Sequence, residues 1–345
     1  MKIQSVRIQG LFNEFDYDLN LNPDLTFLHS PNGCGKTVLM HLVYSLFRSD
    51  IEYVQETPFN KLYIDFADGS MLIVQNDGGK ISMQMQKSGV SNVTFEELER
   101  VIDVNYLPPE RMTIRKKDGH LVNTLEYYAQ ELYETIRRAK DDKELVVPPK
   151  DGRKDMTDSE LEFWCKDLKA KLDFIADAGF QPEIPENLRF PPSRYDLMDN
   201  RPAYEDLAFS VSEYVERNYP LSESIIVFKD IVNSILINKT MDVSESGKLV
   251  ITMRNGTALP LNKLSSGESQ ILVMFYSILF HCQAGSLLIV DEPEISLHVS
   301  WQQVLGDYFN DISRVRNIQM VITTHSPQII HDKWDLAQEL VRKNA

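Results

Sequence analysis

The feature that most constrains this chain is a glycine-rich loop between a short strand pattern and a helical pattern. The loop reads Ser-Pro-Asn-Gly-Cys-Gly-Lys-Thr over residues 30–37. Before it, Leu25 and Phe27 alternate with polar residues as in a strand, and after it apolar residues recur at helical spacing from Val38 to Phe47. A strand that runs through glycines into a helix is typical of α/β folds with a mostly parallel sheet.

This loop carries the groups that hold a phosphate. It matches the pattern G-x-x-x-x-G-K-[ST] except at its first position, where Ser30 replaces glycine. Gly33 and Gly35 let successive backbone N–H groups turn inward as an anion nest. Lys36 offers a positive charge to β- and γ-phosphates, and the Thr37 hydroxyl is placed to bind Mg²⁺. The alternative is a glycine-rich turn that only caps a helix.

Two apolar runs that read as buried parallel strands also end in chemically active residues. Residues 287–290 are followed by Asp291 and Glu292, and residues 320–322 lead to His325. Because ligands bind at the carboxyl ends of such strands, Asp291 is suited to hold Mg²⁺ through water and Glu292 to polarise an attacking water. His325 is placed to donate to a γ-phosphate or to that water. The alternatives are an exposed acidic strand end and a structural histidine.

A fourth segment, Leu-Ser-Ser-Gly-Glu at residues 264–268, precedes an apolar helical run from Ile271. Ser265 and Gly267 at a helix start make a second small anion site. The same residues are also a common way to begin a helix, so this segment alone leaves a structural role open.

The remaining patterns predict an antiparallel part and a helical part. Residues 1–29 read as two strands joined through Asn22-Pro23, and short strands with turn signals between them are expected around residues 62–66, 72–74, 81–85, 239–243 and 248–254. Two apolar helical stripes follow the meander: Leu121, Leu125, Tyr128, Leu132 and Ile136, and Leu161, Trp164, Leu168, Leu172 and Ile175. Thr157 and Glu160 form a capping pattern before the second stripe. Residues 181–202 read as a connector, and the longest helix is expected to reach about 25 residues.

Composition limits the setting in which the chain works. Basic residues number 36 against 51 acidic, a formal charge of -15, so contact with nucleic acid requires a local basic patch. The short run Arg111, Arg115, Lys116 and Lys117 is the candidate, with a solvated basic turn as the alternative. Three cysteines without a Cys-x-x-Cys pair argue against disulfides or thiolate zinc and fit a reducing compartment. With no signal region and no apolar run near the ~20 residues of a membrane span, we expect a cytoplasmic protein.

The order of the four segments resembles a known family. A phosphate loop, then Leu-Ser-Ser-Gly-Glu, then a strand ending in Asp-Glu, then a strand followed by histidine is similar to the ATP-binding-cassette (ABC) class of P-loop ATPases. It is similar in particular to SMC-like bacterial AAA-family proteins, because the signature ends in Glu and residues 291–298 resemble a Walker B and D-loop stretch. The resemblance covers residues 1–110 and 225–335.

This resemblance implies an α/β P-loop NTPase fold of the ABC-ATPase head type, with a mostly parallel core sheet, an antiparallel β subdomain and an inserted helical subdomain. We expect an N-terminal ATPase lobe at 1–110, the helical insert at 111–224 and a C-terminal ATPase lobe at 225–345. The glutamine lid of many relatives has no counterpart here. Residues 104–111 resemble a Y-L-P-x-x-R segment of related ATPases but supply no glutamine, so the lid stays unassigned.

The resemblance also implies that two protomers sandwich two ATP molecules with Mg²⁺. Ser265 and Gly267 of one subunit would contact the γ-phosphate held by Lys36 of the other, and His325 would be the switch histidine. Residues after the first strand, Phe12 and Asn13, would contact the adenine unless Phe12 is a core residue. The implied site comprises catalytic Glu292, His325 and Lys36; nucleotide-binding Asn32, Gly33, Cys34, Gly35, Lys36, Thr37, Ser265, Gly267 and Glu268; and metal-binding Thr37 and Asp291.

By the same resemblance, the chain would be a dimeric switch that hydrolyses ATP and controls a partner effector in anti-phage defence. It is similar to overcoming-lysogenisation-defect-like ATPase heads without a fused nuclease. About 20 residues follow His325, too few for a further domain, so the effector, a nuclease or toprim-type protein, would be a separate chain. The alternatives are an SMC-like ATPase that clamps DNA in repair or chromosome maintenance, and a scaffold that binds ATP without hydrolysis. Higher oligomers and nucleic-acid contact stay open.

Overall fold

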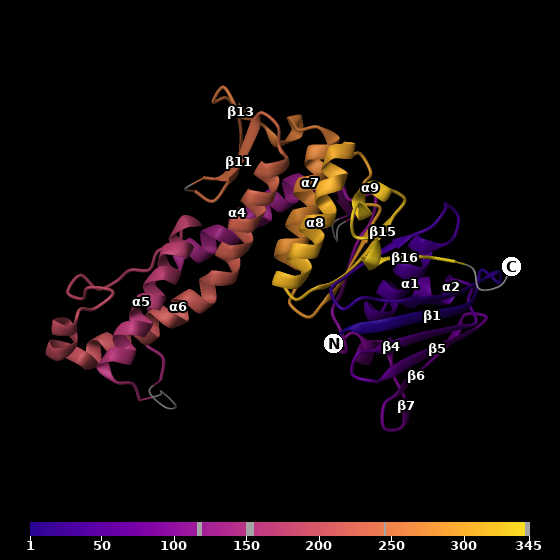
Figure 1. The fold of residues 1–345 in the computed structure, drawn as a ribbon, viewed down its shortest axis with the longest axis horizontal. Coiled ribbons are helices and arrows are strands. Elements are labelled where there is room, and N and C mark those ends of the chain that lie inside the picture. The colour runs from indigo at the N-terminus through magenta and orange to yellow at the C-terminus, as the bar shows by residue number, and fades with distance from the viewer. Residues whose placement is uncertain (116–118, 150–154, 245, 342–345) are drawn as a thin grey trace. The chain divides into compact units, whose positions relative to one another are not determined.

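The computed structural model describes residues 1–115, 119–149, 155–244 and 246–341. The contacts between residues divide the chain into two compact units (Figure 1). Unit 1 comprises Met1–Ile114 and Ser265–Ala345, and unit 2 comprises Arg115–Leu264. The domain limits expected at 110/111 and 224/225 stay predictions of domain organisation.

The first sheet of unit 1 is antiparallel, with strand order β2-β1-β4-β5-β6-β7. Its strands are β1 (Ile3–Leu11), β2 (Phe15–Asn20), β4 (Lys61–Phe66), β5 (Met71–Asp77), β6 (Lys80–Gln86) and β7 (Val90–Asn92). Buried and half-buried residues alternate along β4 and β5, as expected for strands with one face on a core. The meander predicted at residues 62–85 is therefore confirmed.

The N-terminal segment contains one more strand than we expected. Residues 1–29 form three strands because β1 turns back into β2 through Phe12 and Asn13, which adopt φ of 54° and 57°. Neither the Asn-Gly nor the Asp-Gly pair typical of tight hairpins marks this turn in the sequence. Phe15 and Tyr17 of β2 then pair with Leu11 and Ile8 of β1.

The second sheet of unit 1 is parallel throughout, with order β16-β3-β15-β14-β8. Its strands are β3 (Leu25–His29), β8 (Val104–Leu107), β14 (Leu287–Asp291), β15 (Gln319–Thr324) and β16 (Ala337–Glu339). Every residue of β14 and β15 is buried, which confirms the two central strands predicted from apolar runs. A parallel core sheet beside an antiparallel sheet is the predicted fold class.

Helix α1 (Lys36–Phe47) connects the cores of the two sheets. Its buried residues Leu39, Leu42 and Leu46 belong to one cluster with residues of β1, β4 and β14. Helix α8 (Val299–Val315) packs on β3 and β15. The other helical elements of unit 1 are α2 (Ile51–Glu56), α3 (Phe95–Leu98), α7 (Ser266–Tyr276), the π-helical turn η2 (Ser277–His281), α9 (Pro327–Ile330) and η3 (Trp334–Leu336).

Unit 2 is mainly helical. It contains α4 (Thr124–Asp141), α5 (Asp158–Asp177), α6 (Arg194–Ile235), β10 (Leu121–Asn123), β11 (Lys239–Val243), β12 (Leu249–Met253), β13 (Ala258–Leu259) and η1 (Leu261–Lys263); β9 (Thr113–Arg115) lies at its boundary with unit 1. The capping box of Thr157 and Glu160 opens α5 as predicted. Leu121, which we assigned to the first helical stripe, lies in β10 instead and is 65% exposed.

The longest helix is a correction to the sequence analysis, which expected about 25 residues. Helix α6 spans 42 residues, with non-helical angles at Asn200 that kink it. Pro202 follows this kink within the first turn, where a missing N–H leaves no helical bond unmade, so the helix extends into the predicted connector. Pro220 lies further along the same helix without ending it. Neither α6 nor any other described helix is long and apolar enough to cross a membrane.

Candidate nucleotide-binding site

The phosphate loop is set by glycine angles and by one bond from the antiparallel sheet. Gly33 and Gly35 adopt φ of 81° and 73°, a left-handed conformation that side chains disfavour, and Gly35 is the residue that caps α1. The hydroxyl of Tyr17 donates to the carbonyl oxygen of Cys34 at 2.7 Å and so ties the loop to β2. No acidic residue lies in the first turn of α1, which favours an anion at this helix start.

The loop lysine is buried and points back into its own loop. Lys36 is 5% exposed, and its Nζ donates to the carbonyl oxygen and to Oγ of Ser30, both at 2.9 Å. Burial lowers the pKa of Lys36, while the charges of Cys34 and Glu292 act in the opposite direction. Ser30, which departs from the glycine of the pattern, therefore supplies two of the lysine's acceptors.

Asp291, at the end of β14, is fully buried and accepts two hydroxyl donors. Tyr106 of β8 donates to Oδ2 at 2.8 Å, and the Thr323 hydroxyl of β15 donates to Oδ1. Burial and the Asp291 charge raise the pKa of Tyr106 above its ordinary range, which keeps this hydroxyl a donor. The alternative of an acidic strand end exposed to solvent is therefore wrong for Asp291.

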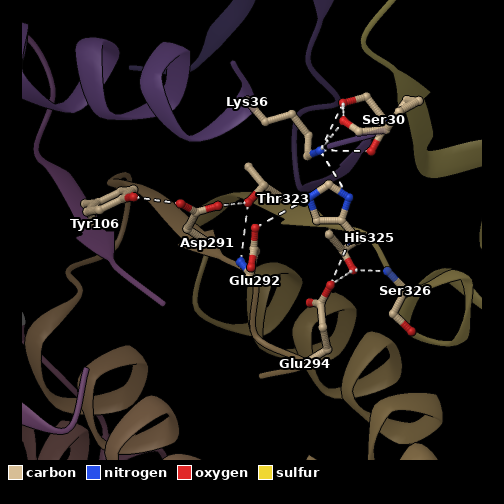
Figure 2. Close-up of polar contacts among 11 residues, drawn as sticks. Ser30, Lys36, Tyr106, Asp291, Glu292, Glu294, Thr323, His325 and Ser326 are labelled. Atoms are coloured by element: carbon tan, nitrogen blue, oxygen red, sulfur yellow. Dashed lines mark hydrogen bonds and ion pairs between the residues drawn. The ribbon is translucent and has the colours of Figure 1, made fainter. Parts of the chain in front are cut away.

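Glu292 and His325 lie on adjacent strand ends and face each other (Figure 2). Glu292 adopts φ of 46°, an uncommon value for a residue with a side chain, and its backbone N–H donates to the Thr323 carbonyl at 3.0 Å. His325 has Nε2 at 3.5 Å from Glu292 Oε1 and Nδ1 at 3.4 Å from Lys36 Nζ. Glu294 accepts the His325 backbone N–H at 2.7 Å, which fixes this histidine between the lysine and the glutamate.

These residues surround one cavity of about 480 Å³. It is lined by residues 32–38 together with Glu292 and His325. The volume lies in the range of small-molecule sites, and the backbone N–H groups, buried lysine and helix start fit a phosphate. Thr37 and Asp291 offer oxygen ligands that suit Mg²⁺, which commonly uses few protein ligands beside phosphate oxygens and water. No cluster of three or more His, Cys, Asp or Glu that could hold a metal occurs among the described residues.

The signature segment is held by hydrogen bonds within its own residues at the start of α7. Ser265 caps α7 by accepting the Glu268 N–H, and Glu268 Oε2 accepts the Ser265 N–H at 2.9 Å. A Cβ added to Gly267 would lie 2.7 Å from the Ser296 carbonyl oxygen and 3.2 Å from the Trp301 ring. Ser265, Gly267 and Glu268 are not among the residues that line the described cavity. Their nucleotide-binding roles stay predictions.

The candidate basic patch does not form as expected. Arg111 is 4% exposed, and its Nε donates to Oε1 of Gln270 on α7. Its Nη2 lies 3.3 Å from the Pro293 carbonyl oxygen, so this side chain is an internal link and the prediction of a surface contact was wrong for it. Arg115 is exposed, whereas Lys116 and Lys117 lie outside the described residues. A lone arginine after Pro-Pro-Glu carries no sequence signal of burial.

Phe12 is not a core residue. It is 43% exposed, and its ring lies 3.9 Å from the position that a Cβ on Gly35 would take. The turn of β1 into β2 therefore presents an aromatic ring beside the phosphate loop. Its role and that of Asn13 toward adenine stay predictions.

Comparisons with known proteins agree with this architecture. The family model described as "AAA domain, putative AbiEii toxin, Type IV TA system" matches residues 31–331. A curated relative, "Retron Ec83 probable ATPase" of Escherichia coli, is 24% identical over 205 residues, and the match covers 55% of this chain but only 35% of that protein.

A solved SMC head domain shares the fold. The SMC head bound to the C-winged helix domain of ScpA has a TM-score of 0.54 and 10% identity, covering 96% of this chain and 92% of that one. The SMC head domain from Thermotoga maritima has a TM-score of 0.47 and 9% identity, covering 98% and 93%. The family match spans most of the chain, and this chain is therefore a member of that AAA-domain family with the fold of an SMC head.

Proposed function

We propose that this chain binds ATP with Mg²⁺ and hydrolyses it as a dimeric switch. The observation that carries the proposal is the meeting of Lys36, Glu292 and His325 at one cavity whose wall is the phosphate loop. These three residues come from distant segments of the chain, and local structure alone gives no reason for them to converge. Membership of the AAA-domain family and the name of the retron relative support an ATPase.

The geometry supports a role for each residue of the site. Lys36 and the loop N–H groups bind the β- and γ-phosphates. Thr37 and, through water, Asp291 would hold Mg²⁺, which would neutralise phosphate charge when bound. Glu292 polarises the attacking water, and His325, within reach of both Glu292 and Lys36, contacts the γ-phosphate.

The adenine end of the site is Phe12. Its half-exposed ring beside Gly35 offers a flat apolar face for a base, and Asn13 follows it in the same turn. This contact would orient the nucleotide without taking part in hydrolysis.

The signature acts in trans. Ser265 and Gly267 are separate from the cavity of their own chain, and they lie at the start of an 11-residue helix. In the sandwich, they contact the γ-phosphate held by Lys36 of a second copy. ATP binding then closes the dimer, and hydrolysis opens it.

The dimer would control a separate effector, a nuclease or toprim-type protein, in cytoplasmic anti-phage defence. The AbiEii toxin description of the family and the similarity to a retron ATPase support this setting. The alternative of a DNA-clamping ATPase is supported by the SMC-head fold, but the burial of Arg111 removes one residue of its candidate basic patch.

The test combines ATP turnover with mass by light scattering, with and without ATP·Mg²⁺. We expect wild-type turnover, and in Glu292→Gln a loss of turnover of about a thousandfold with an ATP-dependent dimer. The matched control is Glu99→Gln, an exposed glutamate in unit 1, which should behave as wild type. Normal turnover by Glu292→Gln would overturn the site assignment, and a mass that ignores ATP would overturn the switch.

A further inference from the structure

Arg111 connects three separate segments of unit 1. Its Nη1 lies 3.4 Å from the Pro108 carbonyl oxygen in its own loop, and its Nε donates to Gln270 Oε1 on α7. Its Nη2 lies 3.5 Å from the Glu292 carbonyl oxygen and 3.3 Å from that of Pro293. One planar guanidinium therefore touches the loop after β8, the helix that begins with the signature, and the turn that carries the proposed catalytic glutamate.

A buried guanidinium needs a reason beyond filling space. Burial lowers the pKa of Arg111 to about 10, opposed by the charges of Glu294 and Asp291, so the side chain stays charged at neutral pH. Apolar residues of similar volume commonly replace buried charges without loss of stability. What they do not replace is the rigid fork of five donors, which reaches several acceptors at once.

Two acceptors of the Arg111 guanidinium are backbone carbonyls at Glu292 and the residue after it. The Glu292 backbone adopts an uncommon left-handed φ of 46°, and the carbonyls on both sides of the Glu292-Pro293 link accept from the same nitrogen. A shift of Arg111 therefore shifts the backbone from which the Glu292 side chain extends.

The side-chain acceptor of Arg111, Gln270, lies close to the signature in the sequence. Gln270 is five residues after Ser265 on the same 11-residue helix, and it is 6% exposed. Because a short helix moves as a body, any displacement of the signature residues is carried to the Gln270 amide.

We propose that Arg111 is a positioning residue that couples the signature helix α7 to the Glu292 turn. The inference rests on the proposed function, in which Ser265 and Gly267 engage the partner's nucleotide while Glu292 acts on the chain's own. Engagement of one nucleotide is thereby transmitted through Gln270 and Arg111 to the catalytic glutamate at the other. Turnover then depends on both sites being filled.

The test uses the full chain with two substitutions that act at the same contact. Arg111→Lys keeps the charge and removes the fork, and Gln270→Met keeps the volume and removes the amide acceptor. Arg100→Lys is the matched control, because Arg100 is an exposed arginine of unit 1. Three quantities are measured: kcat with its Hill coefficient in ATP, equilibrium binding of a fluorescent ATP analogue, and the ATP-dependent mass in the Glu292→Gln background.

We expect either variant to lower kcat by about 10- to 100-fold and to bring the Hill coefficient toward 1, since small displacements of a catalytic group have effects of this size. Nucleotide affinity should stay within about twofold and the closed dimer should still form. The double variant should be no slower than the slower single variant, because both changes remove one contact.

Two results would overturn the coupling. One is fully additive losses of kcat in the double variant, and the other is a lowered unfolding temperature with kcat and Hill coefficient unchanged. If Arg111→Lys does not fold, Gln270→Met decides by the second result: a lowered unfolding temperature with unchanged kcat and Hill coefficient overturns the coupling, and a lowered kcat with a Hill coefficient near 1 supports it. A wild-type protein that binds no ATP would instead overturn the proposed function, and the coupling with it.

Discussion

The phosphate loop and the signature segment both belong to unit 1, but they satisfy their polar groups in different ways. At the loop, Lys36, Glu292 and His325 come from distant parts of the chain and face one cavity. At the signature, Ser265 and Glu268 satisfy each other in a capping box. Local structure explains the second arrangement fully and the first not at all. A site within one chain can therefore be identified by convergence, whereas the signature, which we propose is shared with a second copy, looks like an ordinary helix start.

The largest effect expected at the loop is that of Lys36→Ala. The ammonium is buried and held by Ser30, so its removal takes away a prepared phosphate contact. We expect ATP affinity to fall about a hundredfold or more, from the loss of roughly 3 kcal/mol of charge-assisted bonding. Titration with a fluorescent ATP analogue measures it. Lys80→Ala, at an exposed lysine on β6, is the control, and unchanged affinity in Lys36→Ala would contradict the loop assignment.

The next effect distinguishes the signature segment from the phosphate loop directly. Gly267→Ala places a methyl group 2.7 Å from the Ser296 carbonyl oxygen, so the loop at Ser296 must shift. Because neither Gly267 nor Ser296 lines the cavity, binding of ATP by the single chain should stay within about twofold. Overpacking forces backbone shifts, so the added methyl group should displace the signature residues and weaken the ATP-dependent dimer about tenfold.

The control for this glycine is Gly89→Ala, where an added Cβ meets nothing within 4 Å and the backbone is not left-handed. Light scattering at several protein concentrations gives the dimer constant. A Gly267→Ala protein that binds ATP poorly but dimerises normally would mean that the signature contacts the nucleotide of its own chain. The phosphate loop and the signature would then belong to one site.

The same contrast explains how far the sequence could predict the molecule. Motifs carried by neighbouring residues were predicted correctly because their physics is local: the glycine turn between β3 and α1, strand β14 and the capping box of α5. The meeting of Lys36, Glu292 and His325 was expected from the family resemblance, whereas other contacts between remote residues were missed. Arg111 meets Gln270 across 159 positions, and Tyr106 meets Asp291 across 185. No spacing rule connects such pairs, since only the parallel pairing of β8 with β14 brings that tyrosine to the aspartate.

A moderate effect is expected from Tyr106→Phe. The Tyr106 hydroxyl donates to Asp291 Oδ2 and so orients the carboxylate proposed to hold Mg²⁺. Without it, the Mg²⁺ concentration that half-saturates nucleotide binding should rise about tenfold, while binding without Mg²⁺ is unchanged. Tyr63→Phe, whose ring lies beside Arg7 on the antiparallel sheet, is the control. An unaltered Mg²⁺ dependence would show that Asp291 needs no such orientation.

The smallest expected effect is a change in how stability depends on pH, at a histidine of the helix that follows the phosphate loop. His41 lies on α1 with its ring 4.2 Å from that of Tyr53 and 5.1 Å from that of Tyr106. Burial lowers the pKa of His41, against the opposing charges of Asp50 and Asp291, so the folded chain favours neutral imidazole. As the pH falls below the ordinary histidine value of about 6.5, the unfolded chain binds the proton first and the fold loses stability. His41→Phe keeps a ring in place and should lose about 2 °C less in unfolding temperature than wild type between pH 7.5 and 5.5. Equal losses in both proteins would mean that acid destabilises the fold through groups other than His41.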